Sequence, residues 1–179
     1  MTAADLPHSW HAGCPVGPDQ LRRLRLVYWG FDGAAHTGTL IVAADVVPVV
    51  VRAFERLYDA RFPIRLMVPI DAYGGSDDAS VAADNTSSFN CRDAVTSGPP
   101  HWSEHAYGTA IDIDPFENPY VEGSTVTPPG ATAYADRSRI RPGMITPGSV
   151  ALRAFTDQGW GWGGVWNTPD YQHVSRSGH

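Results

Sequence analysis

The sequence contains no lysine, so all 13 of its basic residues are arginine, and its formal net charge is −6. A negative chain of this kind lacks the basic surface that binds the phosphates of nucleic acid. The longest apolar run, residues 40–51, is interrupted by Asp45 and Pro48 and is too short to cross a membrane. Residues 1–10 lack the basic start and apolar centre of a signal peptide. We therefore expect neither a nucleic-acid partner nor a transmembrane segment.

Cysteine is scarce, since Cys14 and Cys91 are the only two. Neither lies in a C-x-x-C spacing, which argues against a metal site made of thiolates. The two cysteines can form one disulfide if the protein is exported. If the protein is cytosolic, two buried free thiols are equally expected. The sequence also lacks the G-x-S-x-G motif of serine hydrolases, the H-E-x-x-H zinc helix and an EF-hand loop. These absences exclude several common hydrolase and metal-binding classes.

The length of 179 residues suits one domain with a sizeable core, and 18 glycines with 15 prolines predict many turns and long loops. Residues 1–20 are rich in proline and glycine and are expected to form an N-terminal arm, which Cys14 could attach to the rest. Residues 21–179 are then expected to form the functional domain.

Hydrophobic periodicity predicts an α+β fold. Alternating apolar residues predict strands over 24–29, 37–43, 64–70, 109–114 and 171–175, and helical spacing predicts helices over 45–60 and 147–158. Asp45 and Thr146 are the expected N-caps of these helices. Residues 71–85 are expected to be a polar loop, and residues 116–143 a long loop that could wall a substrate groove. Together these elements predict a central antiparallel sheet with helices packed on one face.

The chemistry centres on residues 103–115, where His105 and Asp112 lie seven positions apart. A turn at residues 107–108 followed by a strand would bend the chain and bring both side chains towards one point. Near the C-terminus, Asp170-x-x-His173 offers a second imidazole and a spare carboxylate. Two nitrogens and one oxygen, with a fourth position left to water, are typical of catalytic zinc. The alternative is that the two histidines are unrelated surface or hydrogen-bonded residues.

These motifs together resemble a known family. Ser103-x-His105-x-x-Gly108-x-Ala110-x-Asp112-Ile113, followed by Trp166 and Asp170-x-x-His173, is similar to the zinc D-alanyl-D-alanine carboxypeptidase and L-alanyl-D-glutamate peptidase family. That family includes VanY-type carboxypeptidases and phage endolysins, and the resemblance covers roughly residues 62–175. It implies a Hedgehog/DD-peptidase-like fold, zinc bound by His105, Asp112 and His173, and Asp170 as the general base.

The resemblance also implies roles for residues around the metal. An arginine upstream of the first metal histidine contacts substrate in the family, and Arg92 takes that place here, because guanidinium binds carboxylates and carbonyls in a fork. A surface salt bridge is the alternative for Arg92. Ser103 is expected to hold the turn or a ligand by hydrogen bonding. Trp166 is expected as a wall of the site, and Tyr107 as a further substrate-contacting or supporting residue.

The implied function is zinc-dependent hydrolysis of peptidoglycan stem peptides, most like a D-alanyl-D-alanine carboxypeptidase. An L-alanyl-D-glutamate endopeptidase is one alternative. A non-catalytic zinc-holding binding module of the same fold, as in Hedgehog-type domains, is another, although the presence of Asp170 favours an enzyme. We expect a monomer acting outside the cell, at the cell wall or in the periplasm.

Overall fold

The computed structural model describes residues 1–94 and 99–179. Its strands, in chain order, are β1 (Leu21–Trp29), β2 (Ala35–Ala43), β3 (Leu66–Met67), β4 (Asn85–Thr86), β5 (Ala110–Asp112), β6 (Tyr120–Glu122), β7 (Thr125–Thr127), β8 (Gly161–Trp162) and β9 (His173–Ser175). Its α-helices are α1 (Val47–Asp59), α2 (Asp77–Ala82), α3 (Thr132–Ala135) and α4 (Val150–Thr156). Short 3₁₀ helices are η1 (Ala3–Asp5), η2 (Pro18–Gln20), η3 (Ala44–Val46), η4 (Ile70–Tyr73), η5 (Glu104–Tyr107) and η6 (Gly163–Val165). None of the helices in these described ranges is long and apolar enough to span a membrane.

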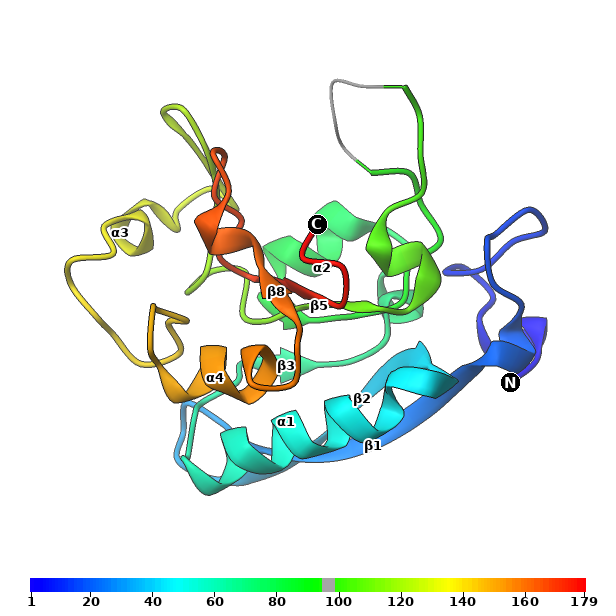
Figure 1. The fold of residues 1–179 in the computed structure, drawn as a ribbon, viewed down its shortest axis with the longest axis horizontal. Helices are drawn as coiled ribbons and strands as arrows, with labels where there is room; N and C mark the ends of the chain where they lie inside the picture. Colours follow the sequence, from blue (N-terminus) through cyan, green and yellow to red (C-terminus); the bar gives the residue numbers. More distant parts are fainter. Residues whose placement is uncertain (95–98) are drawn as a thin grey trace.

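The antiparallel hairpin β1–β2 runs along one side of the molecule, with α1 lying against it (Figure 1). Alternation along β1 turns Leu26 and Tyr28 into the core and leaves Arg25 and Val27 exposed. The predicted strands 24–29 and 37–43 are thus confirmed and each extends by a few residues.

Helix α1 confirms the predicted helix but not its predicted cap. Its N-cap is Val46, while Asp45 lies in η3 and its carboxylate contacts Arg176 at 2.6 Å. One face of α1 is buried, and Phe54 on that face meets Phe155 of α4 edge-on at 6.3 Å between ring centroids. This packing of α1 on α4 places the hairpin and the C-terminal third of the chain around one core.

The expected central antiparallel sheet is wrong, because the strands within residues 1–94 and 99–179 divide among four small sheets. Besides the hairpin β1–β2, there are a parallel pair β3–β4, a hairpin β6–β7 and a three-stranded antiparallel sheet ordered β5–β9–β8. The described chain is therefore α+β, with mostly antiparallel pairing and few helices. The three-stranded sheet bears most directly on the chemistry of the molecule, since its register sets Asp112 opposite His173.

The predicted strand 64–70 is reduced to β3, and the predicted loop 71–85 contains η4 and α2. Beyond the pair Met67 and Thr86, a side chain takes the place of backbone pairing between β3 and β4. The Asn85 amide accepts from Val68 N at 2.9 Å and donates to Val68 O at 3.0 Å. Helix α2 begins where the Ser76 hydroxyl accepts from Ala79 N at 3.2 Å. Such side-chain bonds to the backbone end one element and start the other without a hydrophobic pattern.

The predicted loop 116–143 contains the hairpin β6–β7 and helix α3, and the predicted helix 147–158 is shortened to α4. Thr146 is not its N-cap. Gly148 has a φ of +73°, outside the helical region, so the helix can begin only after it. Ser149 is the cap, and its hydroxyl accepts from Leu152 N at 3.2 Å.

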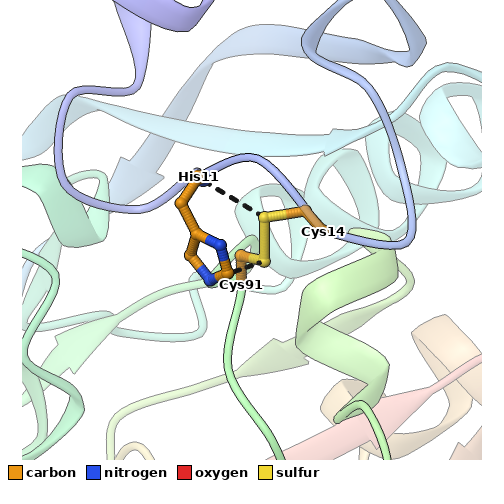
Figure 2. A group of neighbouring side chains, drawn as sticks. All are labelled: His11, Cys14 and Cys91. Atoms are coloured by element: carbon orange, nitrogen blue, oxygen red, sulfur yellow. Dashed lines mark hydrogen bonds between the residues drawn. A yellow bond between two sulfur atoms is a disulfide. The ribbon is translucent and has the colours of Figure 1, made fainter.

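The N-terminal segment, residues 1–20, is attached to the rest of the chain through a disulfide between Cys14 and Cys91 (Figure 2). Leu6 is buried in a second, smaller core with Leu21, Ile41 and Phe89. His11 lies over the disulfide, with its main-chain N–H 3.2 Å from the Cys14 sulfur. The bridge therefore connects this segment to the chain just before the residues that surround the candidate site.

Candidate metal centre and its cavity

The turn before β5 positions His105. Ser103 caps η5, since its hydroxyl accepts from His105 N at 3.3 Å. Gly108 ends η5 with a φ of +68°, and its carbonyl accepts from Ala43 N at 2.9 Å. A Cβ at position 108 would lie 2.7 Å from that same nitrogen, so only glycine permits this approach to β2. The motif residues thus build a rigid bend between η5 and β5.

Beyond this bend, His105, Asp112 and His173 meet. The two carboxylate oxygens of Asp112 each face an imidazole nitrogen at 3.1 Å, Nε2 of His105 and Nδ1 of His173. These two nitrogens lie 3.3 Å apart, and all three side chains are buried. One ligand atom from each residue lies within 4.8 Å of the others, so the three could hold a metal ion.

The outer nitrogens of both imidazoles hydrogen-bond to main-chain carbonyls. Nδ1 of His105 lies 2.7 Å from Ser88 O, and Nε2 of His173 lies 3.2 Å from His179 O. Because a carbonyl only accepts, each outer nitrogen carries the N–H, and the lone pairs of the inner nitrogens point at Asp112. Two imidazole lone pairs and a carboxylate facing one another repel unless a cation or proton lies among them. These two nitrogens and one carboxylate suit zinc. Each imidazole also donates its outer N–H to a carbonyl, as histidines that bind a metal commonly do.

Each of Asp112 and His173 shifts the pKa of the other. Burial raises the pKa of Asp112, but the neighbouring His105 and His173 outweigh it and hold that pKa below its usual value. Burial lowers the pKa of His173, but the hydrogen bond and charge of Asp112 raise it overall. The arrangement therefore favours an ionised carboxylate among positive charge.

Asp170 lies on the same cavity wall, three residues before His173. Its Oδ1 is shielded from solvent and has no hydrogen-bond partner among the residues that the structure describes. Burial, and then the charge of Asp112, raises the pKa of Asp170 to about 7. A carboxyl group whose pKa lies near neutral pH, on the wall of a cavity beside the candidate metal ligands, is suited to proton transfer.

The cavity has a volume of about 720 Å³. Of the residues expected at the site, the cavity is lined by Arg92, Ser103, His105, Asp112, Trp166, Asp170 and His173. Tyr107 is not among the lining residues, and it is 37% exposed.

Two of these lining residues have partners that the sequence does not indicate. The Arg92 guanidinium contacts Asp77 at 2.9 Å, and its Nε has no hydrogen-bond partner within residues 1–94 and 99–179. Arg92 therefore forms a salt bridge, as the alternative prediction has it, and it also lies on the cavity wall, where a substrate-contacting arginine is expected. The Trp166 indole donates to Gly178 O at 3.0 Å, and its ring lies 5.3 Å from the His173 ring.

Sequence reasoning missed several other lining residues, among them Asp77, Trp102, Glu104 and Gln172. Tyr120 and Thr127 also line the cavity, and they lie in residues 116–143, the segment expected to wall a substrate groove. Gln172 directly precedes His173, and its place between two candidate residues was the one available signal. The carbonyls of Ser88 and His179 carry no such signal, because any residue has one.

Asp114 does not support a ligand of this cluster. It is fully buried and accepts from Arg65 N at 2.9 Å, close to Asp84 and Glu117, with which it forms a second group of carboxylates. A third group, His11 with Cys14 and Cys91, has its two sulfurs joined in the disulfide and offers no thiolate.

Comparison with known proteins gives one finding. Residues 97–176, less than half of the chain, match the family model described as D-alanyl-D-alanine carboxypeptidase. The matched segment contains His105, Asp112, Asp170 and His173 and supports assignment of this part of the chain to that peptidase family. No curated protein and no solved structure matches the chain.

Proposed function

We propose that this protein is a zinc-dependent peptidase that hydrolyses peptidoglycan stem peptides, most like a D-alanyl-D-alanine carboxypeptidase. The observation that carries the proposal is the convergence of His105, Asp112 and His173 with both outer nitrogens held by carbonyls. A matched peptidase family over residues 97–176 supports it. The disulfide fits a protein that works outside the cytosol, at the cell wall or in the periplasm.

In this proposal His105, Asp112 and His173 hold the zinc ion. When bound, zinc supplies Lewis acidity, which lowers the pKa of water to ~7 and polarises a carbonyl oxygen. Asp170, on the wall of the cavity, accepts the proton of the attacking water and passes it to the leaving amine. Asp170 lies on the cavity wall three residues before His173, which places its carboxyl beside the proposed metal for both transfers.

Arg92 is proposed to bind a carboxylate or carbonyl of the substrate. Its guanidinium lines the cavity, and the ion pair with Asp77 at 2.9 Å leaves it further N–H donors. The carboxylate of Asp77 also restrains the side chain on the cavity wall. A peptide that ends in a free carboxylate is the substrate such a guanidinium favours, which agrees with carboxypeptidase activity.

The test combines zinc analysis with product analysis. Zinc-loaded protein is incubated with defined muropeptides, and products are identified by mass spectrometry. We expect loss of the terminal D-alanine. Asp170→Ala should keep one zinc per chain and lose at least ~100-fold in turnover, because general acid–base catalysis contributes this much or more. Asp157→Ala, which removes an exposed carboxylate paired with Arg56 outside the cavity, is the matched control and should keep full activity.

The other outcomes are equally definite. Cleavage between L-alanine and D-glutamate would replace the carboxypeptidase assignment with an endopeptidase. Zinc binding and muropeptide binding without any product would show a binding module. Full turnover by Asp170→Ala would overturn the role of Asp170, and protein that binds no zinc would overturn the proposal as a whole.

A further inference from the structure

Tyr120 is a cavity residue to which the proposed mechanism gives no role. It is the first residue of β6 and is half-buried. Its side chain lines the cavity together with those of Asp170 and Thr127. A large aromatic side chain therefore stands on the same wall as the proposed general base.

The backbone around Tyr120 belongs to the same strand pairing as the candidate metal centre. Residues 169–175 pair with β6 at their start and with β5 at their end. Tyr120 lies opposite Asp170 in the first pairing, and Asp112 lies opposite His173 in the second. Both pairings are antiparallel, and Figure 1 shows the hairpin β6–β7 beside the segment that leads into β9. The same segment of chain thus carries the metal-ligand pair and, just before it, the pair that contains Asp170.

This pairing fixes which side chains share a face. Residues directly opposite each other in antiparallel strands turn their side chains to the same face, with Cβ atoms about 4.5–5.5 Å apart. Tyr120 therefore stands beside Asp170, and Thr127, which lies opposite Tyr120 in the hairpin, continues the row. His173 N donates to Asp170 O at 3.3 Å, so a single turn separates this row from the metal ligands. Along the wall, the order is metal ligands, Asp170, Tyr120 and Thr127.

This order determines what Tyr120 meets when a peptide is bound. In the proposed mechanism the scissile carbonyl lies at the metal and the leaving nitrogen lies at Asp170. The residue that carries this nitrogen then comes next along the wall, against the Tyr120 ring. In a carboxypeptidase substrate this is the terminal D-alanine, whose side chain is a single methyl group.

We propose that Tyr120 is a specificity-determining residue whose ring contacts the terminal residue of the substrate and limits the size of its side chain. The proposal rests on the proposed function and names its substrate class more closely. It makes the cavity selective for peptides that end in D-alanine over peptides that end in a bulkier D-residue.

The first test uses the wild-type protein with peptides that differ only in their last residue, D-alanine, D-valine or D-leucine. We expect kcat/KM to fall by at least ~10-fold from D-alanine to D-leucine, because even one methylene group that does not fit a pocket has an effect of this size. Equal values for the three peptides overturn the proposal without any variant being needed.

The second test changes the ring. Tyr120→Val shortens the side chain and keeps a residue that favours a strand. We expect the D-leucine-to-D-alanine ratio of kcat/KM to rise by at least ~10-fold in this variant. Tyr120→Phe keeps the ring and should keep the wild-type ratio within about 3-fold. A merely structural role would lower both values together and leave the ratio unchanged, and either that result or an equal shift in Tyr120→Phe overturns the proposal.

Controls establish that the variants are comparable. Tyr73→Val, at a half-buried tyrosine of η4 outside the cavity, is the matched control and should keep the wild-type ratio. Zinc content and circular dichroism show that each variant folds and keeps its metal.

A binding measurement separates this proposal from the function on which it rests. Calorimetry with Asp170→Ala protein, with and without Tyr120→Val, gives the affinities for the D-alanine and D-leucine peptides. A preference for D-alanine that is lost in the double variant supports the role of Tyr120 even if the wild type shows no turnover. A preference that the double variant keeps, equal affinities in both proteins, or no binding of either peptide overturns it. Absence of turnover alone contradicts only the proposed function.

Discussion

Two groups of buried side chains each contain an aspartate from the same short stretch, Asp112 at the end of β5 and Asp114 just after it. The open cluster, His105, Asp112 and His173, lines the cavity. The closed cluster, Asp84, Asp114 and Glu117, does not line it. Asp112 and Asp114 are only two residues apart, so the difference between the clusters comes from their neighbours and not from their depth in the fold.

Neighbours give the two aspartates opposite electrostatics. Asp112 faces two imidazole nitrogens, which hold its pKa below the ordinary value in spite of burial. Burial raises the pKa of Asp114 well above the ordinary value, helped by the charges of Asp84 and Glu117. Its donors, the Arg65 main-chain N–H and the Thr86 hydroxyl, are neutral. Asp112 therefore favours its ionised form, which can bind a cation, whereas Asp114 favours its protonated form.

The closed cluster has a cation of its own. The Arg65 guanidinium lies 3.4 Å from both Asp84 and Glu117, and it packs over the Phe31 ring at 4.1 Å. One guanidinium against three carboxylates leaves negative charge that protons can neutralise. Burial and a perturbed pKa therefore do not by themselves identify a functional site, and donors that converge beside an accessible cavity are the better guide.

The largest expected effect tests this distinction directly. Asp112→Asn and Asp114→Asn make the same chemical change two residues apart, and each keeps one acceptor oxygen. We expect Asp112→Asn to weaken zinc binding by more than ~100-fold, since losing a ligand exceeds the 10- to 100-fold cost of losing its supporting partner. Asp114→Asn should bind zinc within about 3-fold of the wild type, because neutral donors hold Asp114 in place. Competition with a chelator measures both, and comparable losses would erase the proposed difference between the clusters.

The sequence predicts the open cluster better than the sheet that holds it. Spacing around Gly108 and the distant Asp170-x-x-His173 bring together the side chains that the structure places at one cavity. For His105 and Asp112 the reason is local, because a left-handed glycine and a serine cap define the bend and both have recognisable residue types. His173 lies 61 residues from Asp112, and the resemblance to a known motif is what predicts its place. The hairpin β1–β2 and helix α1 are likewise predicted, because alternation and helical spacing follow directly from burial on one face.

What the sequence does not predict depends on partners far along the chain. Asp84, Asp114 and Glu117 come from three separate segments, and only the folded chain brings them together. The carbonyls behind the histidines belong to the backbone and leave no pattern in the sequence. The division into four small sheets depends on side-chain bonds such as those of Asn85, which hydrophobic periodicity does not register.

For the closed cluster we expect an effect of intermediate size, in which the free energy of unfolding depends on pH. Burial, and then Asp84, raises the pKa of Glu117 from an ordinary value of 4.5 to about 7. A carboxyl whose pKa is higher in the folded state contributes stability that is complete below about pH 4.5 and lost as the pH rises through about 7. Glu117→Gln stays neutral, so its free energy of unfolding should fall less between pH 5 and pH 8, by a difference on the order of 3 kcal/mol at most.

Urea unfolding at several pH values, with a chelator present throughout, measures this difference without a contribution from zinc. Glu122→Gln, at an exposed acid on β6, is the matched control and should keep the wild-type slope. If Glu117→Gln and the wild type lose stability in parallel over this range, the closed cluster does not hold a proton and its contrast with the open cluster fails.

We expect the smallest effect from changes near His179 O, the oxygen that accepts from Nε2 of His173. The Ser175 hydroxyl donates to His179 O at 2.8 Å and is fully buried, whereas the Ser177 hydroxyl reaches the same oxygen at 3.4 Å from an exposed position. Ser175→Ala removes the closer support but leaves the His173 bond to His179 O in place. We expect zinc affinity to fall by less than ~10-fold, below the usual cost of removing a direct partner of a ligand, and Ser177→Ala to change it less still. A larger loss in Ser177→Ala than in Ser175→Ala would contradict the order of support that the two distances to His179 O predict.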